Sequence, residues 1–98
     1  MSKTPENVIF IGKKPVKNYV LAAIMQLGKS KEITLKARGK AISKAVDTAM
    51  IIRDRYIPGT IEIKKVTLGS ETVPVQTEGG ETRERNVSTI EIVLQKKQ

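Results

Sequence analysis

The sequence lacks the side chains that carry most enzymatic chemistry. Its 98 residues include no cysteine and no histidine, which excludes disulfides, thiolate nucleophiles, thiolate metal sites and imidazole acid–base catalysis. A Walker-type phosphate loop is also missing, because Gly12-Lys13-Lys14-Pro15 has neither its spacing nor its magnesium-binding hydroxyl. The sequence therefore predicts a protein that is not an enzyme and that needs no cofactor or metal.

Long apolar segments are missing as well. No apolar run approaches the roughly 18 residues of a membrane-spanning helix. The first residues lead directly into a short apolar run, without the apolar core or cleavage site of a signal peptide. These features predict a cytoplasmic protein without a membrane partner.

What the sequence has in excess is positive charge. Its 18 Lys and Arg against 10 Asp and Glu give a formal net charge of +8 and an isoelectric point near 9.9. The excess is uneven, because residues 1–56 hold 12 basic and 4 acidic side chains, whereas residues 57–98 hold 6 of each. Such a surplus favours a polyanionic partner, contacted mainly by the first half of the chain.

The hydrophobic pattern predicts a single domain over residues 1–98 with the element order β-α-β-α-β-β. The length suits one hydrophobic core. Alternating or continuous apolar residues indicate strands over 8–11, 32–37, 61–68 and 90–95, and helical spacing indicates helices over 16–27 and 41–55. The first strand, four apolar residues in a row, is expected to be buried on both faces. The predicted fold class is α+β, a two-layer sandwich with a mixed four-stranded sheet and both helices on one face.

The last two strands are joined by an unusual segment. Residues 69–86 lack a core pattern and contain Pro74 and Gly79-Gly80, which predicts a long hairpin whose distal part projects from the body. A change of phase across Lys64-Lys65 predicts a bulge in the third strand.

The predicted topology brings two basic turns together. Strand-helix-strand crossovers are right-handed, so both strand-to-helix turns should lie at one edge of the sheet. Gly12-Lys13-Lys14-Pro15 forms the first turn and is followed by Lys17; Arg38-Gly39-Lys40 forms the second and is followed by Lys44. A single lysine is usually only a solvated surface residue. Several of them at helix N-termini oppose the helix dipole, a local cost that a bound phosphate removes.

The few aromatic residues bear on the kind of nucleic acid that is bound. Phe10, Tyr19 and Tyr56 are the only three. The first two fall on stripes that the pattern predicts to be buried, so a sheet surface on which unpaired bases stack is not expected. Binding of a duplex through its phosphates is favoured instead. For Tyr56, a half-buried core position and a protein–protein contact are both open.

Several motifs resemble those of the Alba family of archaeal chromatin proteins. The resemblance covers nearly the whole chain except the hairpin loop and the termini, and it is carried by IGKKPV at residues 11–16, NYVLAA at 18–23, KARGKAISKAVD at 36–47, Ile63-Lys64 and VSTIEI at 87–92. It implies the same β-α-β-α-β-β fold. It also implies a sequence-nonspecific protein that coats and compacts chromosomal DNA as a dimer, with itself or with a relative, and that in many members also binds RNA.

The resemblance also assigns roles to residues. Lys13 and Lys14 correspond to the paired lysines of the family's binding loop, and Lys13 is the expected acetylation site. Arg38 and Lys40 correspond to the basic residues of the second turn, and Tyr56 corresponds to an aromatic residue that joins neighbouring dimers on DNA. Acetylation would remove a charge and weaken phosphate binding.

The hairpin departs from the family pattern. In the family the hairpins are arms that reach along the minor groove, but here residues 69–86 carry a net charge of −2. Arg83 and Arg85 are two apart, so they lie on one side of an extended strand and are the expected contacts of the arm. The complete predicted nucleic-acid site is Lys13, Lys14, Lys17, Arg38, Lys40, Lys44, Arg83 and Arg85.

Two other functions remain open at this point. The same basic patch could hold A-form RNA through phosphates and 2′-hydroxyls, as in a ribonucleoprotein subunit that acts on structured RNA. An enzyme acting on a phosphorylated small molecule is supported only by the phosphate-compatible turns. The absence of His, Cys and a Walker sequence disfavours it.

Overall fold

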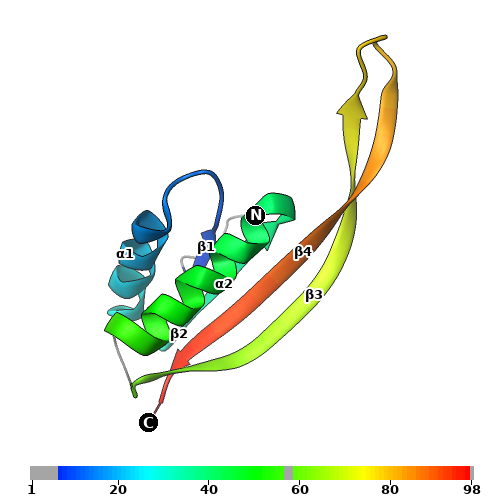
Figure 1. Cartoon of the computed structure of the whole chain (residues 1–98). Helices are drawn as coiled ribbons and strands as arrows, with labels where there is room; N and C mark the ends of the chain where they lie inside the picture. Colours follow the sequence, from blue (N-terminus) through cyan, green and yellow to red (C-terminus); the bar gives the residue numbers. More distant parts are fainter. Residues whose placement is uncertain (1–6, 57–58, 98) are drawn as a thin grey trace.

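The protein forms a four-stranded sheet with two helices on one face and a long two-stranded arm (Figure 1). A computed structural model describes residues 7–56 and 59–97. The elements are β1 (Val8–Phe10), α1 (Val16–Leu27), β2 (Glu32–Arg38), a 3₁₀ turn η1 (Gly39–Ala41), α2 (Ile42–Ile51), a π-helical turn η2 (Ile52–Tyr56), β3 (Ile61–Gln76) and β4 (Thr82–Lys96). This architecture confirms the predicted α+β class and element order.

The strand order is β1-β2-β4-β3. β1 runs parallel to β2 because α1 carries the chain back across the sheet between them, whereas β4 is antiparallel to both of its neighbours. The parallel pairing places the carboxyl ends of β1 and β2 at the same edge of the sheet.

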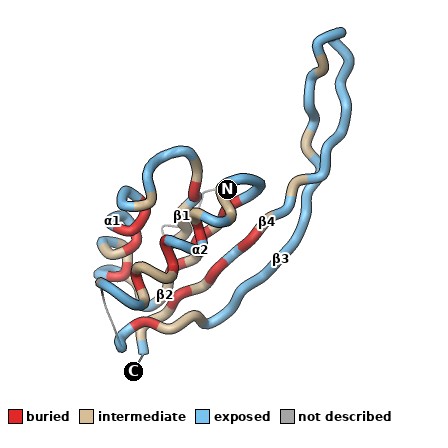
Figure 2. Tube along the Cα trace, viewed as in Figure 1, coloured by how far each residue is buried: buried red, intermediate tan, exposed pale blue. Residues whose placement is uncertain are grey.

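The core lies between the helices and one face of the sheet (Figure 2). Alternate residues of the central strands point into it, so Ile33 and Leu35 of β2 and Leu94 of β4 have no exposed surface. The helices contribute small residues at the closest points, among them the fully buried Ala23 and Ala45. These residues confirm the predicted apolar stripes at the centre of the sheet and on the inner faces of the helices.

Within residues 7–56 and 59–97 no helix covers the other face of the sheet, and this corrects one prediction. Phe10, the last residue of β1, is 60% exposed, so the first strand is not buried on both faces. Ile11, the next residue, is buried. A run of four apolar residues does not reveal whether a sheet is covered on one side or on two, and here α1 and α2 cover only one.

The second helical segment is less regular than its pattern predicts. In place of one helix over 41–55, residues 39–56 form a 3₁₀ turn, an α-helix and a π-helical turn. Gly39 begins the first of these with φ of 58°. The sequence also predicts that Pro58-Gly59 ends this helix, but Pro58 lies outside the described residues.

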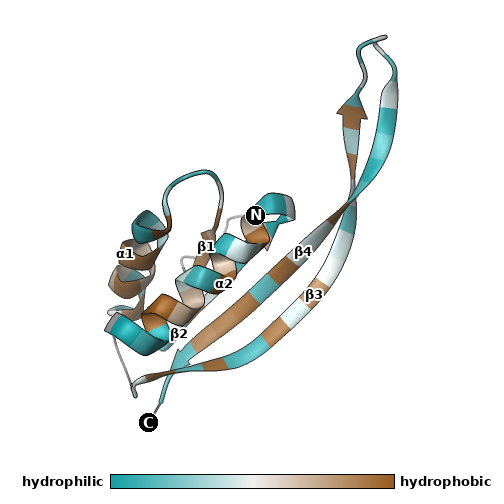
Figure 3. Ribbon diagram, in the orientation of Figure 1, coloured by the Kyte–Doolittle hydropathy of each residue, from teal (hydrophilic) through white to brown (hydrophobic). Residues whose placement is uncertain are grey.

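The hairpin is an arm of two long strands, and Figure 3 shows that apolar residues become sparse along it. The register between β3 and β4 shifts between Ile63 and Lys65, which confirms the predicted bulge. The molecule measures 54 × 31 × 21 Å, and the arm supplies its longest dimension (Figure 1). Among the described residues, no helix is long and apolar enough to cross a membrane.

Candidate nucleic-acid interface

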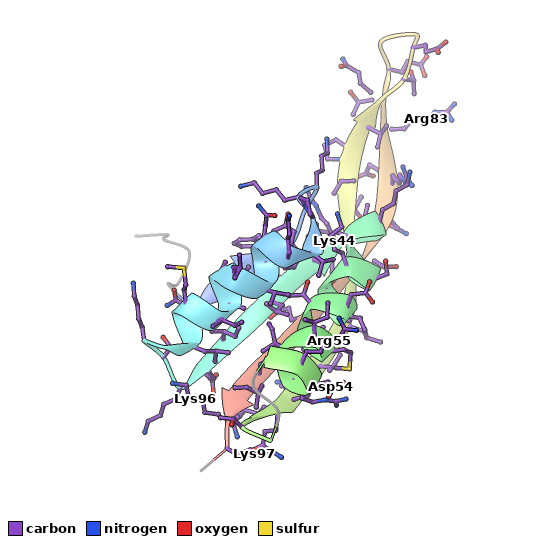
Figure 4. All side chains as sticks on the ribbon, turned by 60° about the vertical axis from the view of Figure 1, so that its left-hand side comes forward. Lys44, Asp54, Arg55, Arg83, Lys96 and Lys97 are labelled. Atoms are coloured by element: carbon purple, nitrogen blue, oxygen red, sulfur yellow. The ribbon has the colours of Figure 1, made fainter. Side chains whose placement is uncertain are left out.

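The two basic turns lie side by side, as predicted. Each follows one strand of the parallel pair β1 and β2, and one side chain of α2, the helix after the second turn, contacts the first turn. The Nζ of Lys44, on the first turns of α2, donates hydrogen bonds to the carbonyl oxygens of Gly12 at 3.2 Å and Lys14 at 3.0 Å. Lys44 is labelled in Figure 4 at this end of α2. The loop that carries Lys13 and Lys14 is therefore anchored to the second helix.

Tyr19 holds the same loop from inside the protein. Its phenol oxygen accepts hydrogen bonds from the backbone N–H of Gly12 at 2.8 Å and of Lys14 at 3.0 Å. The Tyr19 side chain is only 8% exposed, so this oxygen is fixed by the core around its ring. Tyr19 and Lys44 together provide partners for the N–H and carbonyl groups of Gly12 and Lys14.

The second basic turn depends on a glycine and an ion pair. Gly39 adopts a left-handed φ of 58°, which lets the chain turn sharply from β2 into η1 with Arg38 and Lys40 exposed on either side. Nη1 of Arg38 donates to Oε1 of Glu71 at 2.7 Å. Because Glu71 belongs to β3, this contact connects the turn to the base of the arm.

The helix N-termini leave room for an anion. α1 begins after Pro15 and has neither a side-chain cap nor an acidic residue in its first turn, and the same is true of α2. The first N–H groups of α1 therefore carry partial positive charge without a negative side chain beside them. The first N–H of α2, that of Ile42, donates to the carbonyl of Gly39 in η1. Lys13, Lys14 and Lys17 stand exposed around the start of α1.

The predicted site residues fall into two groups. The first surrounds the two turns: Lys13, Lys14, Lys17, Arg38 and Lys40 are exposed there, and Lys44 is half-buried behind them. The second is the arm, where Arg83 and Arg85 are exposed on β4, and Figure 4 shows Arg83 well away from Lys44. The structure thus brings six of the eight residues together and places the other two on a separate extension.

The two arginines of the arm share one face. Arg83 lies opposite Val75 and Arg85 lies opposite Val73, so these four side chains point the same way. Glu84, between the two arginines, points to the other face. Glu71 shares the face of the arginines but is paired with Arg38. Alternation therefore removes one carboxylate, that of Glu84, from the arginine face.

The segment around Tyr56 is described only in part. Tyr56 is the last residue of η2, and its side chain lies outside the described residues. Just before it, Nε of Arg53 donates a hydrogen bond to Oδ1 of Asp54 at 2.8 Å. This hydrogen bond lowers the pKa of the Asp54 carboxyl. Both side chains are largely exposed (Figure 4 labels Asp54), so the pair is a surface feature.

Sequence reasoning missed the parts that hold the loop. Tyr19 was identified only as a core residue, although a tyrosine on an apolar helix stripe signals a hydroxyl that needs a partner inside the fold. The contact of Lys44 with the first turn joins residues 30 and 32 positions apart, and no local pattern signals it.

Comparison with known proteins assigns the family. The family model for Alba matches residues 7–70, which include both basic turns, both helices and the base of the arm. The chain belongs to the Alba family. The resemblance inferred from the motifs is confirmed.

Relatives within the Alba family agree over nearly the whole chain. The DNA/RNA-binding protein Alba of Pyrobaculum islandicum is 50% identical over 91 residues, which cover 92% of this chain and 95% of that protein. The solved structure of Alba from Thermoplasma volcanium is 48% identical and superposes with a TM-score of 0.78 over 91% of this chain and 99% of that one. ALBA1 from Trypanosoma brucei has a TM-score of 0.74 and 25% identity, and covers 96% and 72% of the two chains.

Proposed function

We propose that this protein is a sequence-nonspecific architectural protein that coats and compacts double-stranded DNA as a dimer, in association with the chromosome. The observation that carries the proposal is the pair of basic turns, which follow neighbouring parallel strands, with the first turn bonded to α2 through Lys44. Phosphate contacts do not read sequence. A surface made of lysines, an arginine and helix N-termini therefore suits any duplex, and a +8 chain gains affinity from counterion release.

Each group of residues has its own part in this proposal. Lys13, Lys14, Lys17, Arg38 and Lys40 contact phosphates, and the first N–H groups of α1 add partial positive charge behind the lysines. Lys44 keeps the first loop in place. Arg83 and Arg85 extend the contact along the duplex from the arm. Acetylation of Lys13 would remove one of the exposed charges and weaken binding.

An uncovered apolar strip supports dimerisation. Val66 and Leu68 lie opposite Ile92 and Ile90 in the sheet register, so they point to the same side as the helices. No described helix reaches them, and they are 50% and 75% exposed. Val46 of α2 is also exposed. A second copy packed two-fold on this strip would bury it and would present two basic surfaces and two arms to one duplex.

RNA is the second candidate ligand. The relative from Pyrobaculum islandicum is named a DNA/RNA-binding protein. Phosphates are common to both duplexes, so the basic surface fits A-form RNA as well. A ribonucleoprotein role would appear as a clear preference for the RNA duplex. The contact between neighbouring dimers through Tyr56 stays a prediction, because its side chain lies outside the described residues.

A salt series with matched duplexes tests the proposal. The protein is titrated into fluorescent DNA duplexes of two unrelated sequences and an RNA duplex, between about 50 and 200 mM salt. We expect log affinity to fall linearly with log salt, with the same slope for both DNA sequences, about −0.9 for each phosphate neutralised. Affinity that ignores salt, or that depends on one sequence, would contradict the proposal.

A double substitution locates the surface. Lys13→Glu with Lys14→Glu should weaken binding to every duplex alike and reduce the salt slope. The matched control is Lys29→Glu with Lys31→Glu, which makes the same charge change at exposed lysines beyond the far end of α1. Equal losses in the two double variants would show that only net charge matters and that the turns are not the binding surface.

A further inference from the structure

The face of the sheet without helices carries a hollow next to the basic turns. Its volume is about 560 Å³, within the range of small-molecule sites. The residues that line it come from all four strands or their ends: Phe10, Ile11, Lys36, Ala37, Arg38, Glu71, Thr89, Ile90 and Glu91. The helices that pack on the opposite face leave this side of the sheet open (Figure 1).

An exposed aromatic ring lies in this hollow. Phe10 is 60% exposed, although β1 runs directly into the buried Ile11. Its strand partner is Lys36, whose Nζ lies 6.0 Å from the ring centroid. A large apolar ring that is exposed to water is stabilised little by packing against the core. It offers a flat surface on which another ring can stack.

The polar side chains around the ring form two exposed ion pairs. Lys36 lies 4.0 Å from Glu91, and both side chains are more than a third exposed. Arg38 and Glu71 form the other pair, also exposed. Exposed ion pairs of this kind contribute little, so a ligand with both a negative group and N–H donors can exchange partners with them.

We propose that this hollow binds an unpaired nucleobase of single-stranded nucleic acid, stacked on Phe10. The inference rests on the proposed function and adds a second mode of binding to it. The hollow adjoins the phosphate-binding surface, since Phe10 stands two residues before Gly12 and Arg38 belongs to both. A strand leaving a duplex end at the basic turns would therefore reach the ring directly.

The chemistry of the hollow matches a nucleotide. The base stacks on the ring of Phe10, its phosphate faces Lys36 and Arg38, and N–H groups on the base edge donate to Glu91 or Glu71. Each of the four bases carries at least one such N–H, so the site tolerates sequence, as stacking sites for single strands do. The shared ligand chemistry is an unpaired base, from either RNA or DNA.

The absence of tryptophan makes a direct probe possible. Because the chain has no Trp, Phe10→Trp introduces a fluorophore that reports on this hollow alone. We expect its emission to be quenched by a twelve-nucleotide single strand of RNA or DNA and to change little with a blunt duplex of the same sequence. Quenching by only one of the two single strands would assign the site to that nucleic acid. Equal emission changes with the single strands and the duplex would overturn the proposal.

Affinity measurements with a second variant complete the test. Phe10→Leu keeps an apolar side chain on the strand but removes the aromatic face, and it should weaken single-strand binding about fivefold to a hundredfold while duplex binding changes less than about twofold. Leu21→Ala is the control, because Leu21 is 58% exposed on α1, away from the hollow. It should leave both affinities unchanged.

Failure of this inference differs from failure of the proposed function. If Phe10→Leu binds single strands as tightly as the unmodified protein while duplex binding keeps its salt dependence, the base site is wrong and the duplex surface stands. If the unmodified protein does not bind duplexes, or if Lys13→Glu with Lys14→Glu has no effect on them, the proposed function is wrong. Retained duplex binding in both Phe10 variants shows that they are folded.

Discussion

The exposed lysines of the first turn depend on two residues behind them. Tyr19 accepts two hydrogen bonds from loop N–H groups, and Lys44 donates two to loop carbonyls. A loop whose backbone is held at both Gly12 and Lys14 loses little conformational freedom when it binds, so more of the phosphate attraction appears as affinity. These two side chains therefore matter for binding as much as the lysines they position.

Tyr19→Phe tests the first support. The substitution keeps the buried ring but leaves the N–H groups of Gly12 and Lys14 without their acceptor, at a cost of about 1–2 kcal/mol. We expect the melting temperature to fall by about 4–8 °C for each kcal/mol, together with a severalfold loss of duplex affinity. Thermal unfolding and a binding titration measure the two effects. An unchanged affinity at unchanged stability would show that the hydrogen bonds are dispensable.

Lys44→Met tests the second support against a matched lysine. Lys44 donates two hydrogen bonds to carbonyl oxygens, so its replacement should lower both the melting temperature and the duplex affinity. The salt slope should change by less than the value of about 0.9 that one phosphate contact contributes. Lys17→Met, at an exposed position on α1, should leave the melting temperature unchanged and reduce the slope by about 0.9. If Lys44→Met instead reduces the salt slope by about 0.9 without changing the melting temperature, Lys44 binds phosphate directly.

At the scale of elements, the second turn depends on the backbone of one glycine. Gly39→Ala places a Cβ on a left-handed residue with φ of 58°, which costs about 1–2 kcal/mol. The turn should relax and move Lys40, lowering the melting temperature and weakening duplex binding. Gly79→Ala is the control, because nothing lies within 4 Å of its added Cβ and its φ is not in the left-handed region. Equal melting temperatures for the two variants would contradict this reasoning.

The arm shows how the period of a strand organises charge. Alternation places Arg83 and Arg85 on one face with Val73 and Val75, and places Glu84 on the other. The sum of charges over residues 69–86 is negative, yet one face of the arm remains suited to a phosphate backbone. The net charge of a two-stranded arm therefore does not predict which of its faces can contact DNA.

At the scale of the whole molecule, the uncovered strip on β3 predicts the oligomeric state. Leu68→Lys places a charge on an apolar position that is 75% exposed, and we expect it to convert a dimer into a monomer in sedimentation. A monomer contacts about half as many phosphates, so its salt slope should fall to about half.

Met25→Lys is the control for the dimer. It makes the same charge change at a position on α1 that is 71% exposed. This variant should keep the mass and the salt slope of the unmodified protein. Loss of the dimer in Met25→Lys but not in Leu68→Lys would place the contact between copies on the helix surface instead.

Sequence patterns were sufficient for the local features. Helical spacing predicted α1 from Val16 to Leu27, a change of phase at Lys64-Lys65 predicted the bulge, and the order of strands and helices predicted the two basic turns. Each of these depends on residues close together in the chain, where backbone geometry fixes the spacing between side chains. The motifs shared with the Alba family predicted the same fold independently. Net charge, too, is a property of the sequence alone.

Which surfaces are covered depends on packing between distant parts of the chain. Phe10 and Leu35 look alike in an apolar pattern, yet one is 60% exposed and the other fully buried. The difference arises because two helices cover one face of the sheet and leave the other open. The same holds for Lys44, whose partners lie 30 and 32 residues away, and for Leu68, beyond the reach of the helices. Burial depends on what packs from elsewhere in the chain, which a local pattern does not contain.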